Sequence, residues 1–294
     1  MNKDTYALLK TLTNKSNIKI VSRGNKAILY ALRIAKRLGK KTVIIQDQGG
    51  WLTYKQFSKK LKLALIELKT DYGIINKKNL KNIDKNSVLL INSLTGYFAE
   101  QDMDTIYSIC KKKNCLVIND ISGSIGTKAA GYGDILVCSF GIDKPLNYGK
   151  GGLLAVKNKE WLKLTEIKEE KFDDSFYEKL LNLEKRLQYL KKINKKIKQD
   201  LKDYNIVHKD KQGINVIVKF NNETSKQSFD GFRSEASKPF RKTEGFSKSL
   251  SNKFDKKEKK QLEDYCKKNN YQYTVCPRYI RVLCDAISIE VKRC

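Results

Sequence analysis

The sequence predicts an α/β fold with a mostly parallel central sheet flanked by helices, followed by a small α+β domain at the C-terminus. Two observations support the first part: short apolar runs have the character of buried strands, and helical patterns separate several of them. A third supports the second part, because the pattern changes after Trp161. We therefore expect residues 1–160 to form the large domain and residues 161–294 to form a long connecting helix and the small domain.

The predicted strands of the large domain are short runs, most of them rich in Val, Ile and Leu. Such runs are typical of strands buried on both faces of a sheet. They are Ile18 to Val21, Val43 to Gln46, Leu63 to Leu68, Val88 to Asn92, Cys115 to Asn119, Ile135 to Phe140 and Leu153 to Val156. Helices are predicted at Lys26 to Leu38, Tyr54 to Lys62 and Asp102 to Lys113. The alternation favours βαβ units.

The second part is predicted to begin with one long helix. Apolar residues from Phe176 to Tyr204 recur at spacings of three or four on a charged background, so one face of this helix is apolar. The following small domain is predicted to contain strands at Ile214 to Phe220, Tyr273 to Val275 and Ile280 to Cys284, and a helix at Lys256 to Asn269. The polar, basic segment 221–255 is expected to be a mobile loop or insertion.

Charge and cysteine usage limit the function classes. No apolar stretch of roughly 18 or more residues is present, so no membrane partner is expected. Seven scattered cysteines without a CxxC pair, and one histidine, favour free thiols in the cytoplasm and no metal site. The net charge of +28 would attract anions, and nucleic acid such as tRNA is a candidate partner, although the lysines are spread through nearly every segment.

Three segments combine residues that suit one kind of chemistry. At Ser22 to Ala27 a strand turns through glycine into a helix, whose N-terminal amides could hold a phosphate, although many such glycines are purely steric. Asp120 ends an apolar strand, where it could hold a proton on a pyridine nitrogen or cap a turn. Lys144 follows the strand that ends at Ser139 and precedes the pair Gly151-Gly152, and a desolvated lysine there could form a Schiff base.

In their order, these segments resemble the DegT/DnrJ/EryC1/StrS aminotransferases, which are fold-type I pyridoxal-phosphate enzymes. Ser22 to Ala27 resembles the family's phosphate-binding turn, Asn119-Asp120 its strand end, and Ser139 through Lys144 to Gly152 its lysine segment. The stretch from Thr95-Gly96 to Asp104 is also similar. The resemblance covers about Ile18 to Lys157 and implies pyridoxal 5′-phosphate as cofactor, a small-molecule amino acid as substrate and a homodimer.

The resemblance also implies roles for individual residues. Gly24, Asn25 and Ser139 would hold the phosphate, Asp120 would pair with the ring nitrogen, and Lys144 would carry the cofactor as an imine. Trp51 or Tyr54 would stack on the ring, and Trp51 is the preferred candidate, with core packing as the alternative. For the substrate carboxylate the preferred residue is Arg281, with Arg278 second, and a surface charge is the alternative for either.

Two departures from the family pattern bear on the activity. Gly123 stands where the family usually has a Gln or similar group near the cofactor's phenolic oxygen, and Lys150 replaces a Glu. An aminotransferase is the preferred function. A lyase or sulfur-transfer enzyme that could act on an aminoacyl-tRNA is a second hypothesis. Cysteine desulfurases usually stack a histidine on the cofactor, but the one histidine, His208, lies outside the three segments, and Cys276 is the one candidate for the nucleophilic cysteine. A catalytically silent protein that binds nucleic acid or an acidic partner is the third.

Overall fold

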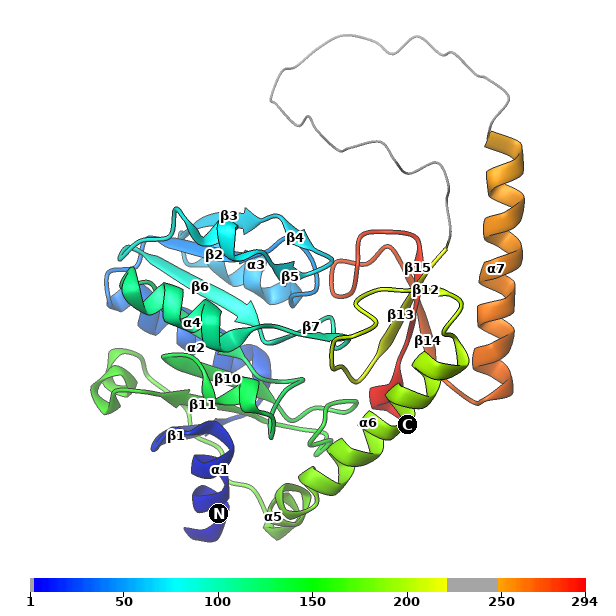
Figure 1. Cartoon of the computed structure of the whole chain (residues 1–294). Coiled ribbons are helices and arrows are strands. Elements are labelled where there is room, and N and C mark those ends of the chain that lie inside the picture. Colours follow the sequence, from blue (N-terminus) through cyan, green and yellow to red (C-terminus); the bar gives the residue numbers. More distant parts are fainter. Residues whose placement is uncertain (1–2, 221–247) are drawn as a thin grey trace, which may run out of the picture.

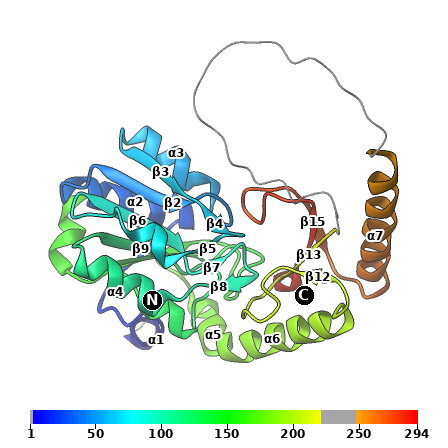
Figure 2. The ribbon, with the colours of Figure 1, turned by 45° about the horizontal axis from the view of Figure 1, so that its top comes forward.

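The chain forms a large and a small domain that lie side by side (Figure 1). The structure, a computed structural model, describes residues 3–220 and 248–294, and the side chains of all of these except 248–255. The sheet of the large domain and the small sheet are well separated, and helix α6, Leu183–Asp200, runs from one domain to the other (Figure 2).

Seven strands within the described residues form the central sheet, in the order β1-β11-β10-β9-β6-β2-β3. Their bounds are β1 Asn17–Val21, β2 Thr42–Gln46, β3 Ala64–Leu68, β6 Ser87–Asn92, β9 Leu116–Asp120, β10 Ile135–Ser139 and β11 Gly152–Val156. Strands β10, β9, β6, β2 and β3 are parallel, and β11 is antiparallel to both of its neighbours. The prediction of a mostly parallel sheet is confirmed.

Helices cover both faces of this sheet because each has one apolar side. The helices are α1 Lys3–Thr13, α2 Gly24–Arg37, α3 Leu52–Lys60, α4 Met103–Lys112 and α5 Asp174–Leu181, with short helices η1 Lys77–Leu80, η2 Lys128–Gly131 and η3 Lys159–Leu164. Helices α2 and α3 pack on one face, and α1, α4 and α5 pack on the other. Two small hairpins, β4 Thr70–Asp71 with β5 Ile74–Ile75 and β7 Leu94–Thr95 with β8 Ala99–Glu100, extend the connections.

The small domain is an antiparallel sheet packed against helices. Its strands are β12 Asn205–Ile206, β13 Val216–Lys219, β14 Tyr273–Cys276 and β15 Ala286–Ile289, in the order β12-β13-β15-β14. Helices α6, α7 Lys248–Lys268 and η4 Val291–Arg293 complete it. Its core includes Leu190 and Ile197 of α6 with Val218 and Ile287 of the sheet.

The predicted single long helix is wrong, because it is broken at Asn182 into α5 and α6. The apolar residues of the stripe serve two different cores. Phe176 and Leu183 pack on the large domain, whereas Leu190 belongs to the core of the small domain. The change from one core to the other falls within α6, between Leu187 and Leu190, so α6 keeps the connecting role that the sequence indicated, while α5 packs on the large domain.

Three further expectations differ from the structure. Strand β3 is not buried on both faces, because it is the edge of the sheet and Ile66 is 49% exposed. Residues 280–284 form no strand but a turn in which the Arg281 N–H bonds to the Arg278 carbonyl, and the strand begins only at Ala286. Most of the segment 221–255, expected to be a loop, lies outside the described residues. Its last part, 248–255, belongs to helix α7, since this part contains no Gly or Pro that would interrupt a helix.

Among the helices of the described ranges, none is long and apolar enough to cross a membrane.

Candidate active site

A cavity of about 320 Å³ lies at the carboxyl ends of β6, β9 and β10, where the large domain meets the small domain. Its volume is within the range of small-molecule sites, and ligands of open α/β sheets bind at this edge. Seven of the eight predicted site residues line it: Gly24, Asn25, Trp51, Asp120, Ser139, Lys144 and Arg281. Arg278 is exposed and is not among the lining residues.

The first turn of α2 forms one end of the cavity. The amides of Lys26 and Ala27 bond to the Arg23 carbonyl at 2.9 and 3.3 Å, so the amides of Gly24 and Asn25 precede the first bonded ones and have no partner within the helix. The Ser139 hydroxyl accepts a hydrogen bond from the Gly141 N–H at 3.3 Å and keeps its own hydrogen to donate. These groups suit a phosphate.

Gly24 is required because the helix end approaches strand β10 very closely. A Cβ atom at Gly24 would lie 2.6 Å from the Cβ and 3.0 Å from the Cα of Ser139. We therefore expect Gly24→Ala to push the first turn of α2 away from β10 and to weaken pyridoxal-phosphate binding tenfold or more, as measured by titration of the visible band. Gly131→Ala is the control, since its Cβ would meet only the Asn14 Cβ, at 3.9 Å. Equal affinities for both variants would contradict this.

Trp51 precedes helix α3 and is held at the cavity wall by a hydrogen bond. Its indole N–H donates to Asn25 Oδ1 at 2.9 Å. Its ring centroid is 5.5 Å from the ammonium group of Lys144. Trp51 therefore links the first turn of α2 to the lysine, and its stacking on a cofactor ring stays a prediction. Tyr54, the other aromatic candidate, is fully buried and has a different role.

Asp120 is fixed at the carboxyl end of β9 by donors to both of its oxygens. The Tyr54 hydroxyl donates to Oδ2 at 2.6 Å, and the backbone N–H of Ser122 donates to Oδ1 at 2.9 Å. Burial, and next the negative charge of Asp120, raise the pKa of Tyr54 well above its usual value, so the phenol stays protonated as a donor. The carboxylate is thus buried, oriented and available to one further cationic group.

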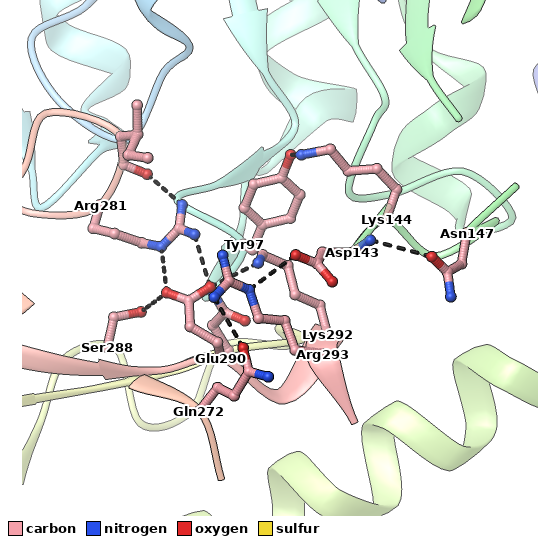
Figure 3. Close-up of polar contacts among 12 residues, drawn as sticks. Tyr97, Asp143, Lys144, Asn147, Gln272, Arg281, Ser288, Glu290, Lys292 and Arg293 are labelled. Carbon is pink, nitrogen blue, oxygen red and sulfur yellow. Dashed lines mark hydrogen bonds and ion pairs between the residues drawn. The ribbon is translucent and has the colours of Figure 1, made fainter. Parts of the chain in front are cut away.

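Lys144 lies in the loop after β10 and extends toward Tyr97 (Figure 3). Its ammonium group contacts the Tyr97 hydroxyl and lies 4.5 Å from the centroid of the Tyr97 ring. The side chain is partly buried. Lys144 and Asp120 therefore line the same cavity, and their placement at opposite parts of one cofactor ring stays a prediction.

Arg281 is buried in the loop between β14 and β15 and is already bound by a carboxylate. Its Nε donates to Glu290 Oε1 at 2.9 Å and its NH2 group to Oε2 at 2.8 Å, while NH1 donates to the Ile280 carbonyl at 2.8 Å (Figure 3). The bidentate face of the guanidinium is therefore occupied within the chain. Substrate binding by Arg281 stays a prediction, and only its remaining N–H groups are available for it.

Lys292 adds a second buried cation to the same carboxylate. Its ammonium group lies 2.7 Å from Glu290 Oε2, and it lines the cavity. Burial, only partly offset by attraction to Glu290, lowers the pKa of Lys292 to about 8. For Glu290, burial acts to raise the pKa, but hydrogen bonding and attraction from Arg281, and then from Lys292, outweigh it and lower the pKa to about 2. The cluster therefore carries an excess positive charge near neutral pH.

The histidine and the cysteine that the sequence offered for sulfur transfer, His208 and Cys276, do not line the cavity. The His208 ring stacks on Phe98, and its Nε2 is 2.8 Å from the Asp71 carbonyl. Cys276 is buried, which raises its thiol pKa, and it does not line the cavity. Cys138 does line it, but burial raises its pKa as well. Within the described ranges no group of His, Cys, Asp and Glu could hold a metal ion.

Sequence reasoning missed three residues of the site. Tyr97 contacts Lys144, Glu290 binds Arg281, and Lys292 binds Glu290, and none of the three was singled out. Glu290 had a usable signal, because it is one charge in the apolar run Ala286 to Val291, and a buried charge needs a partner. Tyr97 had no sequence signal beyond its place after Gly96, since its importance depends on a contact with Lys144, which lies 47 residues away in the chain.

One family model and several solved structures are similar to the chain. Residues 7–171 match the DegT/DnrJ/EryC1/StrS aminotransferase family. No curated protein matches the chain. Solved structures do: 3-amino-5-hydroxybenzoic acid synthase has a TM-score of 0.69 at 12% identity, covering 98% of this chain and 84% of that one.

Two further solved structures are similar. An aminotransferase of the same family from Brucella abortus has a TM-score of 0.65 at 12% identity, covering 98% of this chain and 84% of that one. DesV of S. venezuelae, in complex with a ketimine intermediate, has a TM-score of 0.61 at 15% identity, covering 74% and 68%. At such identities the likeness shows the fold.

Proposed function

The chain belongs to the DegT/DnrJ/EryC1/StrS aminotransferase family and is a pyridoxal-phosphate-dependent enzyme with the fold-type I architecture, and we propose that Lys144 and Asp120 carry out its reaction on an amino acid. The observation that supports this most is that both residues line one cavity at the open edge of the sheet. One offers an amine and the other a fixed carboxylate, which are the two groups that this chemistry needs.

The residues present fit the cofactor. Gly24 lets the first turn of α2 approach Ser139 closely, and the amides of this turn, which have no partner within the helix, suit a phosphate. Asp120, at the end of β9, can accept a hydrogen bond from a protonated ring nitrogen, since Tyr54 and Ser122 hold its carboxylate in place. Trp51 lines the same cavity as Gly24 and Asp120, and its ring can cover a planar ligand.

The chain's own residues then have separate tasks. When bound, pyridoxal phosphate withdraws the electron pair that is released at the substrate's α-carbon. Asp120 stabilises the positive ring nitrogen, and Trp51 limits the access of water to one side of the cavity. The amine of Lys144, once displaced by the amine of the substrate, is the group in position to move a proton to or from the α-carbon as general base and acid.

Transamination is tested against lyase chemistry by incubating the protein and pyridoxal phosphate with a panel of single amino acids. A transaminase converts the cofactor to its amine form and releases the matching 2-oxo acid. A lyase instead releases pyruvate, sulfide or another fragment while the cofactor stays in its aldehyde form. The proposal predicts the first result, and fragment release without conversion would contradict it.

We further propose a homodimer, as the family resemblance implies. Ile142 is 71% exposed beside Lys144, and Leu52 and Leu283 are about half exposed near the same edge of the sheet. Exposed apolar side chains next to a cavity favour a protein partner. Sedimentation equilibrium measures this directly, and we expect Ile142→Asp to shift the equilibrium toward monomer, whereas a single monomeric species at all concentrations would contradict the proposal.

Nucleic acid stays a prediction that rests on charge. A groove of about 410 Å³ along α6 is lined by five lysines, Lys191, Lys195, Lys198, Lys209 and Lys211, with Asp210 as the one acidic lining residue. Binding of tRNA there would weaken steeply with salt and with Lys-to-Ala changes in the groove.

All seven cysteines are unpaired, which supports the prediction of a reducing, cytoplasmic location.

A further inference from the structure

Gly123 cannot have a side chain because Tyr97 occupies the space. A Cβ atom at Gly123 would lie 2.9 Å from Tyr97 Cδ1 and 3.1 Å from Cε1. Gly123 comes three residues after Asp120, at the end of β9. The family that the sequence resembles usually has a Gln or similar group at this position. In this chain a tyrosine from the turn between β7 and β8 fills the position instead.

The Tyr97 ring is held firmly in this place. It is 6% exposed and belongs to the core that includes Leu190 and Val216. Its backbone N–H donates to the Leu94 carbonyl at 3.1 Å, and its own carbonyl accepts from the Ile214 N–H at 2.8 Å. Its φ of +70° is unusual for a residue other than glycine, and such backbone strain is concentrated at functional sites.

Three cations surround this ring, and one of them contacts the hydroxyl. The ring centroid is 4.5 Å from the Lys144 ammonium, 5.2 Å from the Arg281 guanidinium and 5.5 Å from the Lys292 ammonium. The hydroxyl itself contacts Lys144 inside the cavity, as Figure 3 shows. A hydroxyl can both donate and accept. It can therefore receive a hydrogen bond from the protonated amine and give one to a neutral or anionic neighbour.

We propose that Tyr97 is the positioning residue of this active site: its hydroxyl aims the Lys144 amine and donates to the bound cofactor's phenolic oxygen beside that amine, a contact that no side chain at Gly123 can make. The inference rests on the proposed function, because it assigns a partner to the cofactor. It differs from a packing role, since packing needs only the ring and not the hydroxyl.

Tyr97→Phe tests this, because it keeps the ring against Gly123 and removes only the hydroxyl. A donor that stabilises the phenolate oxygen favours the unprotonated form of the linked amine. We therefore expect its loss to raise the midpoint of the pH-dependent change in the visible band by about one to two pH units. Turnover is expected to fall about 10- to 100-fold, with cofactor still bound.

Tyr107→Phe is the matched control, since its hydroxyl donates to Asp134 at 2.9 Å outside the cavity and its loss should leave the midpoint unchanged. A second test moves the hydrogen-bond donor from position 97 to position 123. Tyr97→Ala opens the space at Gly123, and adding Gly123→Gln should return the midpoint toward that of the unmutated protein.

The outcomes separate the two proposals. A visible band in Tyr97→Phe with an unchanged midpoint would overturn the role of Tyr97 and leave the proposed function intact. No visible band in the unmutated protein with pyridoxal phosphate would overturn the proposed function itself, and the role of Tyr97 with it.

Discussion

Lys144→Ala is expected to abolish covalent attachment of pyridoxal phosphate and to lower the turnover of an amino acid by about three orders of magnitude or more, since the change removes both the nucleophile and the general base. Lys144 is the lysine whose amine faces Tyr97 inside the cavity. Borohydride reduction followed by peptide mass analysis locates the attachment. In the unmutated protein we expect the added mass on the peptide that contains Lys144, and in the variant on none.

Two controls separate the loss of chemistry from a loss of fold. Lys150→Ala removes an exposed lysine whose ion pair with Asp173, at 3.9 Å, is also exposed, and it should leave attachment and turnover unchanged. Adding methylamine to Lys144→Ala should restore part of the turnover, because a small amine can enter the space that the side chain left. A reduced adduct on another lysine would show that Lys144 is the wrong assignment.

The prediction from sequence succeeded where the information is local. A strand that ends in a polar residue places that residue at the edge of the sheet whatever the rest of the fold does, and this located Asp120 and Ser139 correctly on the cavity. The turn before α2 is local in the same sense, because a glycine between a strand and a helix allows close approach. Here Gly24 lies so close to Ser139 that a Cβ atom would have no space.

The parts that sequence reasoning missed depend on contacts between distant segments. An apolar stripe fixes which side of a helix is buried, but it shows neither the break at Asn182 nor that α6 packs against two cores. The alternation of apolar residues around Arg281 resembled a strand, yet the Arg281 side chain is held by Glu290, which begins the last turn of the chain. A buried arginine needs a carboxylate, but periodicity does not say which one.

Glu290→Gln is expected to lower the free energy of unfolding by about 3–5 kcal/mol, because removing one partner of a buried ion pair leaves the other charges without compensation. Here two cations are left, Arg281 and Lys292, with side chains that are 5% and 3% exposed. Urea unfolding at pH 7 measures the loss. Glu160→Gln is the matched control, since its pair with Lys163 is largely exposed and should contribute at most about 1 kcal/mol.

The pH dependence identifies the cause of that loss. The pKa of Glu290 is about 2 in the folded protein, below the roughly 4.3 of an unfolded glutamate, so its contribution is complete above about pH 4.3 and is lost as the pH falls toward 2. The difference in stability between the unmutated protein and Glu290→Gln should therefore shrink below about pH 4. A difference that stays constant down to pH 3 would mean that Glu290 acts through packing and not through its charge.

The lowered pKa of Lys292 affects stability on the alkaline side. It is about 8 in the folded protein and roughly 10.4 in an unfolded chain, so the folded state binds fewer protons between these values and its stability rises with pH across that window. Without Glu290 the ammonium form of Lys292 loses its partner and its pKa falls further. The unfolding free energy of Glu290→Gln should thus begin to rise at a lower pH than that of the unmutated protein, and an identical onset would contradict the coupling between the two residues.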